Sequence, residues 1–110
     1  MGDVFVHIVT WNSEACIERC LTSLLEQEAK VVIQVTDNCS YDSSLKIAEK
    51  LGIEYRANPH NYGFCAAHNQ GVASFIKSTC QYLLILNPDT VVRRDPINLL
   101  TESLRTNNSA

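Results

Sequence analysis

Residues 4–9 read Val4-Phe5-Val6-His7-Ile8-Val9, and this almost unbroken run of β-forming side chains leads into an amphipathic helix. In that helix, apolar side chains recur every three or four residues from Ile17 to Leu25, and charged side chains occupy the other faces. A strand followed directly by a helix that can cover it is the repeating unit of an α/β fold. We therefore expect the chain to begin with one strand–helix unit of a sheet.

The same alternation continues along the rest of the chain. Because neighbouring parallel strands need a crossover connection, it predicts an α/β fold: a mostly parallel sheet with helices on both faces. The strand at 82–86 is wholly apolar, and this favours a central position buried on both sides. The further strands are expected at Val31–Val35, Ile53–Ala57 and Tyr82–Leu86, and the further helices at about Leu45–Leu51, Phe64–Ser78 and Pro96–Leu104.

Composition excludes several classes of protein. The 110 residues are 45% hydrophobic and 19% charged, as in a globular domain, and the formal net charge of -3 offers no basic field for nucleic acid. The apolar runs are far shorter than the roughly 18 to 20 residues that span a bilayer. Met1-Gly2-Asp3 lacks the basic start of a secretory signal, so we expect a cytoplasmic protein, with peripheral membrane contact left open.

Cysteine usage agrees with that location. The chain has five cysteines, an odd number, and no Cys-x-x-Cys pair. We expect buried, reduced thiols rather than disulfides or a zinc site.

Polar residues follow every expected strand. In an open α/β sheet, ligands bind outside the carboxyl ends of the strands, although Asn, Asp and Gly are also common in turns for local reasons. Two common phosphate-binding motifs, G-x-G-x-x-G and G-x-x-x-x-G-K-[ST], are missing. Asp37 can accept hydrogen bonds from a base or ribose, and Asp89 can ligate a hard divalent cation that bridges phosphates. The loop residues are Thr10, Trp11 and Asn12; Asp37, Asn38 and Ser40; Asn58 to Asn61 and Gly63; and Asn87 and Asp89.

Four of these segments, in this order, carry a family resemblance that covers Val4 to Val92. Together they resemble the GT-A glycosyltransferases of the family-2 type, particularly the rhamnosyltransferase-like branch. Members of this family have a Rossmann-like sheet. The segments are Val9-Thr10-Trp11-Asn12, Val35 to Asp42, Asn61 to Gly71, and Leu84-Ile85-Leu86-Asn87-Pro88-Asp89.

The resemblance implies transfer of a sugar from a UDP- or dTDP-sugar to a hydroxyl of a carbohydrate or lipid-linked acceptor, with inversion at the anomeric carbon. A divalent cation, Mg²⁺ or Mn²⁺, is implied as cofactor. Carried over to this sequence, Thr10 and Asn12 line the nucleoside pocket, and Asp37 holds the pyrimidine through its N3–H. Asn61, Gly63 and Asn69 lie along the ribose and diphosphate. Asn87 stands in the first position of the metal motif and is counted among the nucleotide-sugar-binding residues, and Asp89 is the charged metal ligand.

Two features depart from the family pattern. Asn87 stands where an acidic residue is usual, and a complete GT-A domain is roughly twice as long as this chain. Residues 1–110 are therefore expected to be one partial domain, the N-terminal donor-binding half, with the catalytic base beyond residue 110. We expect this chain alone to bind donor without transferring sugar.

Two other functions stay open at this point. One is a non-catalytic α/β binding or interaction module that self-associates through an exposed sheet edge. The other is a different α/β nucleotide enzyme with similar loops, and selective binding of purine nucleotides would favour it.

Overall fold

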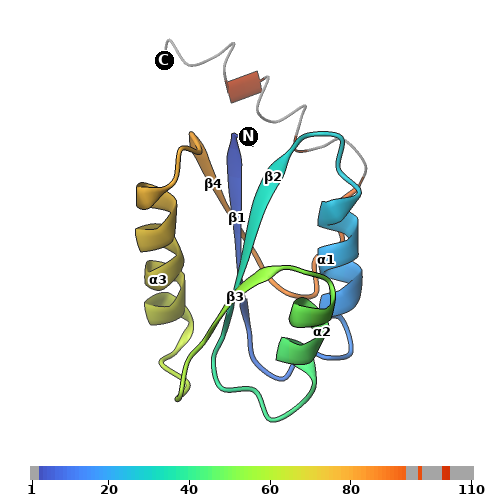
Figure 1. Cartoon of the computed structure of the whole chain (residues 1–110), viewed down its shortest axis with the longest axis vertical. Coiled ribbons are helices and arrows are strands. Elements are labelled where there is room, and N and C mark those ends of the chain that lie inside the picture. Colours follow the sequence, from blue (N-terminus) through green and yellow to red (C-terminus); the bar gives the residue numbers. More distant parts are fainter. Residues whose placement is uncertain (1–2, 94–96, 98–102, 105–110) are drawn as a thin grey trace.

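A computed structural model describes residues 3–93, 97, 103 and 104 of the chain. In these residues four strands form one parallel sheet in the order β3-β2-β1-β4. β1 (Val4–Thr10) lies between β2 (Val31–Asp37) and β4 (Tyr82–Leu86), and β3 (Glu54–Ala57) pairs with the far side of β2 (Figure 1). The α/β prediction is confirmed, with strand bounds that differ from the expected ones by at most two residues.

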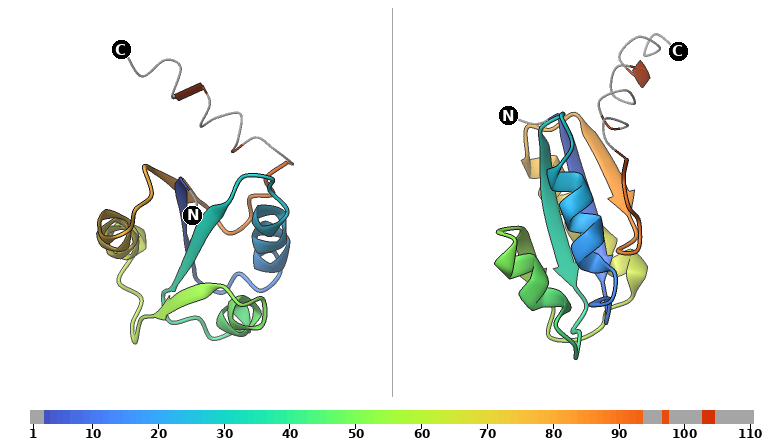
Figure 2. Two further views of the ribbon diagram at one scale, coloured as in Figure 1. Left: turned by 45° about the horizontal axis from the view of Figure 1, so that its top comes forward. Right: turned by 90° about the vertical axis from the view of Figure 1, so that its right-hand side faces the viewer.

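Helices cover both faces of the sheet, as predicted. α1 (Ile17–Leu25) and α2 (Ser44–Lys50) lie on one face, and α3 (Phe64–Lys77) lies on the other (Figures 1 and 2). The helix expected at about Pro96–Leu104 falls largely outside the described residues. None of the helices in the described part of the chain has the length and apolar character needed to cross a bilayer.

The two faces of the sheet differ in chemistry. On the face toward α1 and α2, aliphatic side chains of β1 and β2 pack with those of α1 in one hydrophobic cluster. On the face toward α3, the buried His7 of β1 contacts His68, and Phe5 packs edge-on to Phe75 with ring centroids 6.1 Å apart. A Cβ on Gly71 would come within 2.3 Å of the His7 ring, so only glycine lets α3 approach β1 this closely.

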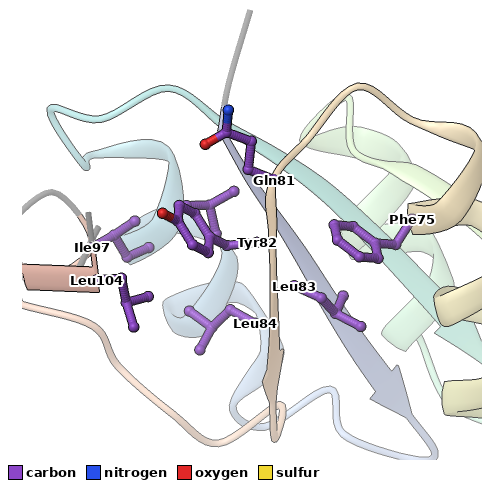
Figure 3. Close-up of a pocket in the computed structure, with 8 residues that line it drawn as sticks. Phe75, Gln81, Tyr82, Leu83, Leu84, Ile97 and Leu104 are labelled. Carbon is purple, nitrogen blue, oxygen red and sulfur yellow. The ribbon is translucent and has the colours of Figure 1, made fainter. Parts of the chain in front are cut away.

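The expectation of a central β4 is wrong. β4 forms the edge of the sheet in the described residues, and β1, with all seven residues buried, is the central strand. β4 is only partly buried, and Ile85 is 44% exposed. Its apolar side chains divide between the two faces, with Tyr82 and Leu84 on one side and Leu83 toward Phe75 on the other (Figure 3). An all-apolar run predicts burial of both faces, but it carries no information about whether both edges are paired.

A cavity of about 270 Å³ lies beside the start of β4 (Figure 3). Apolar side chains dominate its lining, among them Val4, Phe75, Leu84 and Ile97. It stands at the amino end of the strand, away from the loops that follow the carboxyl ends.

The cysteines are less buried than expected. All five are free thiols, but only Cys20 is buried; Cys65 is exposed, and Cys16, Cys39 and Cys80 are half-buried. The half-buried three precede a helix, follow a strand or precede one, where one side of the chain faces solvent. Burial raises the pKa of the Cys20 thiol to about 11, with smaller contributions from Cys16 and Asp89.

Candidate functional site

The carboxyl ends of the strands meet along one side of the sheet, which we call the carboxyl edge. Thr10 at the end of β1 pairs with Asp37 at the end of β2, and Asp37 pairs with Ala57 at the end of β3. β4 ends two residues earlier, with Leu86 beside Ile8. The loops that follow all four strands therefore gather at this edge, where open α/β sheets bind their ligands.

Asp37 and Thr10 form the buried centre of the carboxyl edge. Asp37 is only 4% exposed, and its Oδ2 accepts the Ser40 N–H (3.1 Å) while its Oδ1 accepts the Ser40 hydroxyl (2.5 Å). The fully buried Oγ1 of Thr10 has no hydrogen-bond partner among the described residues. Buried hydroxyls are nearly always paired, so the unpartnered hydroxyl beside Asp37 is an exception that the protein's own described residues do not account for.

The loops at 12–14 and 40–44 are interlocked by reciprocal hydrogen bonds. Asn12, at a positive φ of 51°, donates its N–H to Ser40 Oγ (2.9 Å) and accepts the Tyr41 N–H at its Oδ1 (2.8 Å). Further bonds join Ser13 N–H to Ser44 Oγ, Glu14 N–H to Asp42 Oδ2 and Ser43 N–H to Glu14 Oε2. These hydrogen bonds tie the loop after β1 to the loop after β2.

Asp42 holds the beginning of α2 within these interlocked loops. Its Oδ1 accepts both the N–H and the hydroxyl of Ser44, at 2.9 and 2.6 Å. Desolvation raises the pKa of Asp42, but the hydrogen bonds from Ser44 and Glu14 outweigh it and lower the pKa below its ordinary value. The carboxylate form of Asp42 is thus the one that supports the loop.

The loop between β3 and α3 brings two more predicted residues to the carboxyl edge. The exposed Asn61 accepts the Gly63 N–H at its Oδ1 (2.9 Å), and Gly63, with φ of 89°, precedes the first turn of α3. Asn38 at the end of β2 donates its side-chain N–H to the Gly63 carbonyl (3.1 Å). Gly63 is thereby tied to the strand that carries Asp37. Asn69 lies further along α3 and is exposed.

Buried amides hold this loop, and the sequence assigned them no role. Asn58 donates its side-chain N–H to Asn38 Oδ1 (3.0 Å) and to Gln70 Oε1 (2.9 Å), and Gln70 donates back to Asn58 Oδ1 (3.1 Å). In the sequence, only the position of Asn38 and Asn58 directly after two strand ends indicated that they belong to the site. Gln70 gave none, because its partner lies in another element.

A second buried polar group underlies α3. His7 Nε2 lies 2.7 Å from Thr36 Oγ1, and His7 Nδ1 lies 2.8 Å from His68 Nδ1. Burial, with smaller contributions from His68 and Arg56, lowers the pKa of His7 to about 4, and burial also lowers that of His68. The pair therefore carries no charge at neutral pH and links α3 to the sheet by hydrogen bonding. The sequence alone assigned no function to either histidine, because their contact joins residues that are far apart in the chain.

Asn87 and Asp89 lie in the turn that follows β4, and both side chains are exposed. The Asn87 carbonyl accepts the Thr90 N–H (3.1 Å) and lies 3.8 Å from the Cys20 sulfur. Carboxylate and amide oxygens suit Mg²⁺ or Mn²⁺. However, no group of three His, Cys, Asp or Glu side chains able to hold a metal occurs in the described residues. These two residues fit a cation whose remaining ligands come from water or a bound phosphate.

The structure thus brings the predicted residues together to different degrees. Thr10, Asn12 and Asp37 form one connected group through the strand pairing and Ser40. Asn61 and Gly63 join it through Asn38. Within the described residues, no side-chain hydrogen bond ties Asn69, Asn87 or Asp89 to that group.

Comparison with known proteins shows the family to which the chain belongs. The family model described as Glycosyl transferase family 2 matches residues 5–110, and it specifies no branch of that family. No curated protein sequence matches the chain.

Solved structures share the fold. S. aureus TarS 1–349 in complex with UDP-GlcNAc matches with a TM-score of 0.87 and 22% identity, over 98% of this chain and 32% of that one. The complex of TarS 1–349 with UDP matches with a TM-score of 0.86 and 22% identity, over 98% of this chain and 33% of that one. The mannosyltransferase PcManGT from Pyrobaculum calidifontis, in complex with GDP-Man and Mn²⁺, matches with a TM-score of 0.69 and 20% identity. The match covers 79% of this chain and 27% of that one. The chain spans about a third of the length of the TarS 1–349 structures.

Proposed function

Since the chain belongs to glycosyl transferase family 2, we propose that it is the donor-binding half of an inverting glycosyltransferase that uses a pyrimidine nucleoside diphosphate sugar. The observation that carries this proposal is the buried Asp37 carboxylate opposite the unpartnered Thr10 hydroxyl. Both are at the carboxyl edge, where a nucleotide is expected to bind. The TarS complexes with UDP-GlcNAc and UDP support a uridine donor.

Asp37 recognises the pyrimidine base of the nucleotide in this proposal. An ionised carboxylate accepts hydrogen bonds and donates none, so it pairs with the N3–H of uracil or thymine, whereas cytosine presents only an acceptor at N3. Thr10 and Asn12 complete the nucleoside pocket. The donor is therefore a UDP- or dTDP-sugar.

The diphosphate lies along Asn61, Gly63 and Asn69 toward the turn after β4. Asn87 and Asp89 hold Mg²⁺ or Mn²⁺ there, and PcManGT, which is in complex with Mn²⁺, supports a divalent cation in this fold. A bound cation neutralises the charge that develops on the leaving diphosphate. Asp89 contributes the charged oxygen, and the amide of Asn87 adds a neutral one.

The catalytic base belongs to a later segment in this account. None of the residues assigned here is free to take a proton from the acceptor hydroxyl, because Asp37 binds the pyrimidine and Asp89 binds the cation. We propose that the base and the carbohydrate or lipid-linked acceptor site follow residue 110. A cytoplasmic location is proposed too, and the free thiols support it.

One observation favours a second candidate function. β4 has an unpaired edge among the described residues, and the exposed Ile85 lies on it. Such an edge can pair with another chain, as in a non-catalytic interaction module that self-associates. A light-scattering mass above that of the monomer, together with no nucleotide binding, would favour this function.

Calorimetric titration tests the proposed donor. The chain should bind UDP and dTDP more tightly than GDP or ADP, and Asp37→Ala should weaken UDP binding about ten- to a hundredfold, because a hydrogen bond to a charged group is lost. Glu54→Ala, on the exposed edge strand β3, is a matched carboxylate control and should bind as the parent does. Equal UDP affinity of the parent and Asp37→Ala would remove the assignment, and tighter GDP binding would favour a purine enzyme.

A further inference from the structure

We infer that Ser40 is a specificity-determining positioning residue, which fixes the Asp37 carboxylate as an acceptor for a ring N–H of the donor's base. This inference rests on the proposed nucleotide-sugar function and names how its base is selected. Ser40 contacts both oxygens of the carboxylate: its hydroxyl lies 2.5 Å from Oδ1 and its backbone nitrogen lies 3.1 Å from Oδ2.

The direction of the hydroxyl hydrogen bond follows from a third contact. The Asn12 backbone N–H donates to Ser40 Oγ at 2.9 Å, so this oxygen is an acceptor toward Asn12. A hydroxyl has one proton to donate. Since Asn12 supplies its own proton, the hydroxyl proton of Ser40 is directed to Asp37 Oδ1, and Asp37 accepts at both oxygens.

Asn12 in turn is held in place by the opposite loop. Its side-chain Oδ1 accepts the Tyr41 N–H at 2.8 Å, while its own N–H reaches Ser40. Asn12 and residues 40–41 thus close a ring of two hydrogen bonds between the loops after β1 and β2. The orientation of the Ser40 hydroxyl is thereby fixed before any ligand arrives.

This arrangement limits what Asp37 can recognise. Its two oxygens offer about four acceptor positions, and Ser40 occupies two of them. The remaining positions of an ionised carboxylate can only accept, because it has no proton to donate. A base with a ring N–H, such as uracil or thymine, meets this requirement, whereas cytosine turns a lone pair toward the carboxylate and is repelled.

Thr10 indicates where the base is read. Its strand position pairs with Asp37, and its buried Oγ1 is the polar atom left without a partner there. A hydroxyl can donate to a base carbonyl that flanks the ring N–H. The donor of Thr10 and the acceptor of Asp37 together match the carbonyl and N–H edge of uracil.

The test compares binding of UDP and CDP, which differ only in the base edge, by calorimetry. The parent should prefer UDP about tenfold or more, and Ser40→Ala should lower UDP affinity about tenfold and bring the UDP/CDP ratio toward one. Ser40→Cys keeps the side-chain volume but donates weakly, so it should behave like Ser40→Ala. Ser40→Thr keeps the hydroxyl and should restore the ratio.

Ser43→Ala is the matched control, because the exposed Ser43 contributes to the interlocked loops through its backbone N–H. It should keep the parent's UDP/CDP ratio. Parental ratios in both Ser40→Ala and Ser40→Cys would overturn the inference while leaving the proposed donor site intact. A parent that binds neither nucleotide, or binds CDP as tightly as UDP, would overturn the proposed base recognition itself.

Discussion

Acidification should destabilise the fold through His7, well above the pH at which most carboxylates titrate. Burial is the main cause that lowers the pKa of His7 from 6.5 to about 4. Between these two values the unfolded chain binds a proton at this position and the folded chain does not, so stability falls as pH falls. One pKa unit corresponds to about 1.4 kcal/mol, so the full loss is up to about 3 kcal/mol, and about 2 kcal/mol is lost by pH 5.

Urea unfolding followed by circular dichroism at pH 7.5 and pH 5 measures this loss. His7→Gln replaces the imidazole with an amide that can hydrogen-bond Thr36 but cannot titrate. The free energy of unfolding of this variant should therefore change much less between pH 7.5 and pH 5. The buried His68 has a lowered pKa too and contributes in the same direction, and the double variant with His68→Gln should lose the remaining slope. If the parent is equally stable at pH 7.5 and pH 5, or if His7→Gln keeps the parent's slope, the reasoning is refuted.

Three other outcomes follow from the structure. Gly71→Ala should lower the free energy of unfolding by about 1 to 3 kcal/mol, because its Cβ would meet the His7 ring, and adding His7→Ala should recover part of that loss; a neutral Gly71→Ala would contradict the packing of α3 on β1. Asp89→Asn should abolish the gain in UDP affinity that Mg²⁺ or Mn²⁺ gives the parent and leave uridine binding unchanged, whereas an undiminished gain in calorimetry would place the cation elsewhere. In the folded chain, mass spectrometry should find the exposed Cys65 alkylated long before the buried Cys20, and reduction should leave the melting temperature unchanged, since loss of a disulfide costs about 2 to 5 kcal/mol.

The sequence predicted the elements whose signals are local. Val4–Val9 and Val31–Val35 are runs of β-forming residues that end in polar loops, so the strands and the residues after them could be placed. Thr10 and Asp37 were identified for the same reason, since a parallel sheet brings successive strand ends to one edge. The register that puts them opposite each other confirms that placement.

Other features depend on partners that are distant in sequence. The apolar strand at 82–86 was expected at the centre, but strand order is decided by pairing, and β1 takes that place. His7 lies 61 residues from His68, and no spacing along the chain predicts that contact. Ser40 was identified only as one of the polar loop residues after β2, because its two bonds to Asp37 depend on how the β2–α2 loop folds back onto the strand end.

The central claim is that the carboxyl edge binds a uridine nucleotide, and backbone amide NMR tests it most directly. Titration of the ¹⁵N-labelled chain with UDP and Mg²⁺ should shift the amide signals of residues 10–12, 37–41 and 61–65 saturably. In Asp37→Ala the same shifts should need about ten- to a hundredfold more UDP. Signals of β4 and of the cavity at its amino end should stay in place. Saturable shifts confined to that cavity or to the β4 edge, or none at the carboxyl edge, would contradict the account.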